Sequence, residues 1–172
     1  MKIRQTILAG TAAIFLVAGI VWAQTAQRLR RPDSDFVTKA AQGGMAEVAM
    51  GRLAVQNGSD PAVKSFGQRM IDDHTKANGE LKACVAKKGI AVPANVDSKQ
   101  QATIDRLSKL NGAAFDKAYM RDMVKDHQED VAEFQRESNN GADPDIKAFA
   151  AKTLPTLQEH LKLAQQTEAK LK

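Results

Sequence analysis

Apolar side chains recur at spacings of three and four residues along most of the chain, which is the pattern of amphipathic α-helices. No stretch sustains the alternation of polar and apolar residues that marks a half-buried strand. The pattern therefore predicts an all-α fold. The expected long helices cover residues 36–57, 61–88, 113–139 and 144–171, and a shorter helix is expected near residues 98–110.

Two short segments carry residues that end one helix and begin the next. Each holds a Gly that favours a helix end, an Asp that can cap the following helix, and a Pro suited to that helix's first turn. The segments are Asn57–Pro61 and Asn139–Pro144. Ser34 is the expected N-cap of the first long helix. Short links place the joined helices side by side and antiparallel, as two hairpins.

The two hairpins repeat one sequence pattern. Residues 60–66 (DPAVKSF) match residues 143–149 (DPDIKAF) at an offset of 83, and each segment begins the second helix of its hairpin. A crossover of about 24 residues, which carries the short extra helix, joins the hairpins. This plan is that of a four-helix ferritin-like bundle.

The N-terminus has the pattern of a secretory signal. Lys2 and Arg4 precede an apolar run over residues 7–22, and Val21 and Ala23 supply the small residues before a cleavage site. We expect a signal helix over residues 1–23 that is removed, a linker over 24–33, and the bundle over 34–172. An uncleaved membrane anchor is the alternative, although the run is shorter than the ~20 residues of a spanning helix. Either way, the predicted location is the periplasm or the cell envelope.

Composition narrows the class of partner. The chain is 43% hydrophobic and 26% charged, which suits a packed core, and its single cysteine excludes an intramolecular disulfide. Without residues 1–23, 23 basic and 20 acidic residues remain, a net charge of +3. The basic residues form no run and aromatic residues are few, so no nucleic-acid partner is expected. Membrane association through residues 1–23, a homo-oligomer and an unidentified protein partner remain open.

The polar residues of interest lie on the apolar faces of the expected helices. The chain has three histidines, and each falls within the apolar stripe of a different helix: His74, His127 and His160. Glu47 lies between small residues on the stripe of the first helix. A carboxylate in such a place is costly unless it is paired or binds a cation. Asp130 follows His127 by three residues and is related to Glu47 by the same offset of 83.

These five residues, Glu47, His74, His127, His160 and Asp130, are therefore the predicted metal ligands. Mixed imidazole and carboxylate ligands favour zinc or iron. Met70 and Met123 each precede a histidine by one turn, a pattern that can hold copper(I) but more often fills a core. The alternative is that no metal binds and that the histidines only pair with acids in the core.

The sequence favours a non-enzymatic role without excluding an enzyme, and it disfavours a di-iron oxidoreductase. Ile71 and Leu157 stand three residues before His74 and His160, where di-iron proteins carry Glu-x-x-His. No nucleophile, phosphate or dinucleotide motif is present, so no catalytic residue is predicted. Two functions remain: a metal-binding bundle that stores, buffers or senses zinc or iron, or a non-enzymatic structural or stress-related module of the envelope.

Several stretches together resemble the exported, ferritin-like bacterial family catalogued as domain of unknown function 4142. They span about residues 36–165 and include Phe36 and 46–48, 63–66 and 70–74, 115–119 and 123–127, and 154–161. The resemblance implies a four-helix ferritin-like bundle outside the cytoplasm and no established reaction. Glu47, His74, His127 and His160 match polar positions of the family's helices.

Overall fold

The computed structural model describes residues 29–171, and within that range it contains helices and no strand. The predicted all-α class is thereby confirmed. The predicted signal segment 1–23 lies outside the described residues. Among the described helices, none combines the length and the apolar character needed to cross a membrane. The helices are α1 (Arg31–Asn57), α2 (Pro61–Ala86), α3 (Ser98–Leu107), α4 (Gly112–Asn140) and α5 (Pro144–Glu168).

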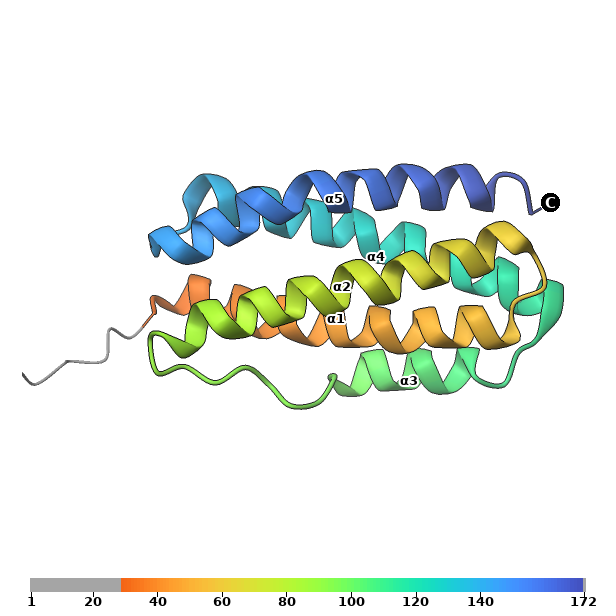
Figure 1. The fold of residues 1–172 in the computed structure, drawn as a ribbon, viewed down its shortest axis with the longest axis horizontal. Coiled ribbons are helices and arrows are strands. Elements are labelled where there is room, and N and C mark those ends of the chain that lie inside the picture. Colours follow the sequence, from red (N-terminus) through yellow and green to blue (C-terminus); the bar gives the residue numbers. More distant parts are fainter. Residues whose placement is uncertain (1–28, 172) are drawn as a thin grey trace, which may run out of the picture.

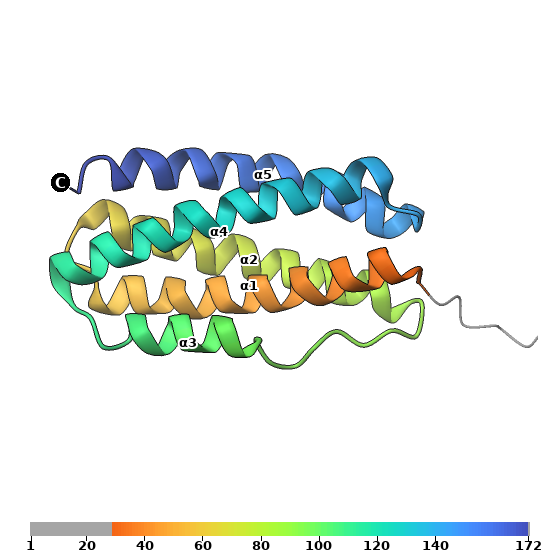
Figure 2. The same cartoon turned by 180° about the vertical axis from the view of Figure 1, so that it is seen from behind.

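The four long helices lie side by side as two antiparallel hairpins (Figure 1). Helix α1 packs mainly against α2, and α4 mainly against α5. The hairpins meet through two further contacts, α2 with α5 and α1 with α4. The connection from α2 to α4 runs back along the length of the bundle, and its helix α3 lies against the outside of α1 (Figure 2).

The first helix begins earlier than the sequence pattern indicated. We expected Ser34 to cap it, but α1 begins at Arg31, with Arg30 in the cap position and no side-chain cap. Ser34 lies inside the helix, where its carbonyl accepts a hydrogen bond from Thr38 Oγ1 at 3.0 Å. The reason is Pro32, because a proline in the first turn loses no helical hydrogen bond and has the helical φ angle.

The predicted caps of α2 and α5 are confirmed. The carboxylate of Asp60 accepts a hydrogen bond from the Ala62 amide at 2.7 Å. That of Asp143 accepts from the amides of Asp145 and Ile146 at 3.0 and 3.2 Å. In both helices a proline follows the cap. These interactions are local, so the sequence is sufficient to predict them.

Two buried aspartates fasten the hairpins to each other. Asp33 of α1 accepts hydrogen bonds from the amides of Ala142 and Asp143, at 3.1 and 2.9 Å, in the turn between α4 and α5. Asp116 of α4 does the same for the turn between α1 and α2, where the amides of Ser59 and Asp60 donate at 3.1 and 3.0 Å. The two aspartates are 83 residues apart, the offset of the sequence repeat. The repeat is therefore a pseudo-twofold structural one.

Two apolar clusters fill the bundle, one toward each end. Phe36, Phe134 and Phe149 are in the first, and Met70, Phe115 and Met123 are in the second. In α2, α4 and α5 a buried histidine separates the two clusters (His74, His127 and His160), and in α1 the buried Glu47 lies next to Ala46, at the boundary between them. The bundle thus has a polar layer in the middle of its core.

We predict that Asp116→Ala lowers the free energy of unfolding by about 2–3 kcal/mol, since it leaves several hydrogen-bond donors of the α1–α2 turn without their charged acceptor. Urea denaturation measures the change, and Asp33→Ala should have a similar effect because it breaks the reciprocal contact. Asp72→Ala, on the exposed face of α2, is the control. If Asp116→Ala lowered the stability no more than Asp72→Ala does, the hydrogen bonds from the buried aspartate would not be needed to hold the turn.

Candidate metal centre

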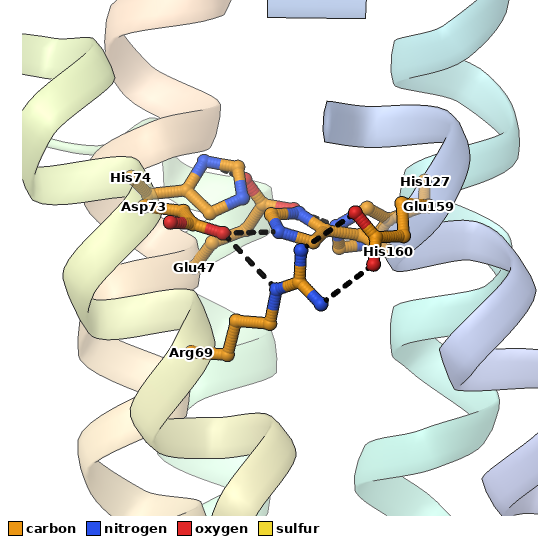
Figure 3. Close-up of polar contacts among 7 residues, drawn as sticks. All are labelled: Glu47, Arg69, Asp73, His74, His127, Glu159 and His160. Carbon is orange, nitrogen blue, oxygen red and sulfur yellow. Dashed lines mark hydrogen bonds and ion pairs between the residues drawn. The ribbon is translucent and has the colours of Figure 1, made fainter. Parts of the chain in front are cut away.

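The polar layer brings four of the five predicted site residues together. Glu47 comes from α1, His74 from α2, His127 from α4 and His160 from α5, so each long helix supplies one (Figure 3). All four are buried, and the rings of His127 and His160 are fully so. Each side chain lies on the inward face of its helix because the apolar residues one turn away on either side pack into the core.

The three imidazole rings face one another. One ring nitrogen from each histidine can be chosen such that all three atoms lie within 4.8 Å of one another. The ring centroid of His74 lies 5.9 Å from that of His127 and 5.4 Å from that of His160. The centroids of His127 and His160 are 5.3 Å apart. Among the described residues, this is the one group of three or more His, Cys, Asp or Glu side chains with so close an approach of ligand atoms.

Each ring is held from behind by a hydrogen bond. His74 Nδ1 lies 2.8 Å from Glu47 Oε2, His127 Nδ1 lies 2.9 Å from the Met123 carbonyl, and His160 Nε2 lies 2.8 Å from Asp73 Oδ2. Because these partners accept, each of these nitrogens carries the proton. The second nitrogens, Nε2 of His74 and His127 and Nδ1 of His160, are buried and have no hydrogen-bond partner. Metal-ligating histidines show this combination of a tethered and a free nitrogen.

A chain of charged groups continues outward from His160. Asp73 Oδ2 also accepts from Arg69 Nε at 3.2 Å, and Arg69 donates two further hydrogen bonds to Glu159 of α5, at 3.0 and 2.8 Å (Figure 3). Asp73 is partly exposed, and it links α2 to the imidazole of α5. The sequence pattern did not assign it a role. The sequence did hold one signal for it: Asp73 directly precedes His74, so it lies on the side of α2 next to the inward face.

Burial and charge act in opposition within the site. Burial favours the neutral carboxyl of Glu47, but the three neighbouring histidines outweigh it and lower its pKa to about 2. Burial likewise opposes the charge of His74, yet Glu47 raises the pKa of His74 overall. Burial prevails at the other two rings, where it lowers the pKa of His127 and brings that of His160 to about 4. In the apo site Glu47 therefore favours its ionised form, which stabilises the proton of His74, whereas burial favours the neutral forms of His127 and His160.

In one close contact of the site, neither of the two atoms carries a proton. Glu47 Oε1 lies 3.3 Å from His127 Nε2, and neither atom has a hydrogen-bond donor. The proton of the neutral His127 ring is on Nδ1, so two lone pairs face each other in a buried place, which is unfavourable. A cation bound between the carboxylate and the imidazoles would remove this conflict. The residues present therefore fit a metal ion.

Asp130, the fifth predicted ligand, is not part of the three-histidine group. Three residues correspond to 300° of helical rotation, so its side chain is turned by about 60° from that of His127. It lines a cavity between α1, α3 and α4 together with Glu47 and Asp126. Burial and the charge of Glu47 raise the pKa of Asp130 well above its usual range and that of Asp126 to about 7. Asp126 was not predicted, although its position one turn before Asp130 was a signal.

A smaller pocket connects the histidines to the surface between α2 and α5. Its volume is about 90 Å³, and its lining includes His74, His160, Thr153 and Asp73. The soft candidate ligands lie elsewhere: Met70 and Met123 are buried in the apolar cluster on one side of the polar layer. Cys84 packs against the opposite cluster, and burial raises the pKa of its thiol, so it favours the protonated form.

Comparisons with known proteins place this fold. The family model described as Domain of unknown function (DUF4142) matches residues 22–167. A DUF305 fragment from Deinococcus radiodurans is 14% identical, with a TM-score of 0.73 over 83% of this chain and 98% of that chain. CopM in the Cu(II)-bound form is 18% identical, with a TM-score of 0.69 over 81% of this chain and 97% of that chain. CopM in the Ag-bound form is 21% identical, with a TM-score of 0.64 over 78% of this chain and 93% of that chain. The search of curated proteins gave no match. At these identities the solved structures show the fold alone.

The pKa shifts predict how the three histidines titrate in metal-free protein. His127 and His160 should stay neutral as the pH falls through 6.5, because burial disfavours their charged forms, and His160 should gain its proton near pH 4. His74 should instead gain its proton above pH 6.5, because Glu47 stabilises the imidazolium. NMR of the ring protons measures all three titrations. Three midpoints at the ordinary value would mean that the rings are solvated and that the described layer is wrong.

Proposed function

The chain belongs to the DUF4142 family, and we propose that it binds one transition-metal ion in the polar layer of its helical bundle. The ligands would be the three histidines, with Glu47 Oε1 as a fourth. The observation that carries this proposal is the three-histidine group: one ring nitrogen from each of three helices lies within 4.8 Å of the other two, and each buried ring has a nitrogen without a hydrogen-bond partner.

The donor set restricts the class of ion. Imidazole nitrogen suits zinc, copper, iron and nickel, and three imidazoles with one carboxylate can complete a tetrahedron. Bonds of 2.0–2.1 Å would bring the nitrogens to roughly 3.4 Å from one another, so the rings need only a small inward shift. The sequence favoured zinc or iron over copper. The similar fold of CopM, which is described in Cu(II)-, Cu(I)- and Ag-bound forms, supports testing copper beside zinc.

The surroundings support reversible loading from outside. The pocket between α2 and α5 leads to His74 and His160, so an ion can reach the rings from that face. We therefore propose buffering or storage of a metal ion, in a ferritin-like bundle that the signal-like residues 1–23 direct to the periplasm or cell envelope. A purely structural module is the second candidate, because Glu47–His74 and Asp73–His160 already form close pairs without any ion.

We predict that untagged, metal-free protein binds about one Zn²⁺ or Cu²⁺ ion per chain and that the ion raises the melting temperature. A ligand at 100 times its Kd stabilises the folded state by about 2.7 kcal/mol. Isothermal titration calorimetry and thermal unfolding measure both effects. His127→Leu and His160→Leu should abolish binding, whereas Met70→Leu should retain it and so separates imidazole from thioether ligation.

The structural alternative makes the opposite prediction for the same variants. His127→Leu would fold as well as the native chain or better, since a buried polar ring would be replaced by an apolar one. A melting temperature that ignores both ions, in native protein with intact helicity, would refute the metal-binding function.

We further predict that Asp73→Asn weakens metal affinity by about 10- to 100-fold while the stoichiometry stays at one ion. Asp73 fixes the proton on Nε2 of His160 and so presents Nδ1 to the site, and loss of such an outer partner typically has this effect. Asp72→Asn is the matched control, because Asp72 is the exposed neighbour on the same helix. Equal affinities of the two variants would show that Asp73 does not position the ring.

A further inference from the structure

The two buried aspartates that fasten the hairpins do not have equivalent partners. Asp116 accepts hydrogen bonds from the amides of Ser59 and Asp60, and a third one from the hydroxyl group of Ser59 at 2.5 Å. The residue related to Ser59 by the offset of 83 is Ala142, which has no hydroxyl group. Asp33 therefore accepts the two amide hydrogen bonds of its turn without the corresponding side-chain donor.

A carboxyl group lies beside the aspartate that lacks the hydroxyl donor. Glu137, in the last turn of α4, is within hydrogen-bonding reach of the Asp33 carboxyl group. The residue related to Glu137 by the offset of 83 is Ala54, which is fully buried and apolar. One contact thus has a serine in its turn, whereas the other has a glutamate in the helix that precedes its turn.

The surroundings of Glu137 disfavour its charged form. The residue is 5% exposed, and its Oε1 is buried without a hydrogen-bond partner. A Cβ atom placed on Gly141 would lie 2.5 Å from Oε1 and 2.7 Å from the Glu137 carbonyl oxygen, so the carboxyl group lies close to the carbonyl end of its own helix. A negative charge is unfavourable at that end of a helix and in a buried place without a donor. A neutral carboxyl group avoids both costs and has a proton to donate.

The cations at this end of the described bundle are engaged by other acids. Arg136 pairs with Glu133 at 3.3 Å, and Lys88 pairs with Asp143 at 2.9 Å. Burial and the charge of the nearby aspartate therefore raise the pKa of Glu137, although Arg136 opposes them. The charged groups that face this carboxyl group come from three places: Asp33 of α1, Glu133 and Arg136 of α4, and Asp143 with Lys88 at the adjoining turn.

We propose that Glu137 makes the contact between α1 and the α4–α5 turn depend on protonation. The neutral carboxyl group of Glu137 donates the third hydrogen bond to Asp33, as the hydroxyl group of Ser59 does to Asp116. When Glu137 releases its proton to solvent, that hydrogen bond is lost and two carboxylates face each other, so the contact weakens. The contact at Asp116 does not change in this way, because a serine hydroxyl group does not titrate.

The proposal fixes the sign of the pH dependence. A carboxyl group whose pKa is raised by folding stabilises the fold at a pH below its unfolded value of 4.5, and this contribution is lost as the pH rises through the folded-state pKa. The histidines also titrate, so the native chain is compared with Glu137→Gln, whose amide can donate to Asp33 at every pH. The ratio of the two unfolding constants, native over variant, should rise about tenfold per pH unit over that interval and then stay constant.

The test is urea denaturation of the full metal-free chain at pH values from about 4.5 to 8. Glu129→Gln is the matched control, since Glu129 is exposed on the same helix, and this variant should follow the native chain at every pH. Hydrogen exchange measured by NMR locates the effect. In the native chain, the protection of the amides of residues 142 and 143 should fall with rising pH relative to that of residues 59 and 60, and in Glu137→Gln it should not.

A ratio of unfolding constants that does not change with pH would overturn the proposal, as would an equal loss of protection at both turns. So would a carbon-13 NMR titration in which the native Glu137 carboxyl group loses its proton at or below pH 4.5. That titration needs no variant, so it decides the question even if Glu137→Gln does not fold. No metal ion enters these measurements, so their outcome is independent of the histidine site.

Discussion

The structure depends on keeping four polar side chains in the middle of an apolar core. Burying a carboxylate and three imidazoles is costly, and the cost is offset only if their hydrogen-bonding atoms meet the right partners. Glu47 and His74 form a buried close pair, and His127 and His160 are tethered by a carbonyl and by Asp73. Each long helix contributes one member, so the layer constrains the rotation and the axial register of all four helices.

The scaffold and the site obey different symmetries. Asp33 and Asp116 are related by the offset of 83, and each fastens the turn of the opposite hairpin. The histidines do not follow this relation: the residue that matches His127 is Gly44, and the residue that matches His160 is Ala77. A Cβ at Gly44 would lie 2.2 Å from Asn78 Oδ1, so the Asn78 side chain would have to move to admit one. A pseudo-twofold framework therefore holds an asymmetric centre.

The likeness to DUF305 and CopM structures concerns the fold, and a fold accommodates many functions. For this chain, the functional argument comes from atoms that burial leaves without partners. Three imidazole nitrogens and one carboxylate oxygen are in that position within the polar layer. An apo core of purely structural purpose would gain stability by replacing such groups with apolar ones.

The sequence by itself determined what depends on neighbours within about four residues: the helices, the Asp60 and Asp143 caps, and the inward stripe that carries each histidine. It misplaced the start of α1 because Pro32 was read as preceding the helix, although proline suits a first turn. The tertiary structure decided which stripes meet, that Asp130 stays outside the three-histidine group, and that Asp33, Asp73 and Asp116 act across helices. The physical reason is that local periodicity fixes the face of a helix on which a side chain lies. Only the packing of four helices fixes the rotation and axial shift that bring distant donors and acceptors within hydrogen-bonding distance.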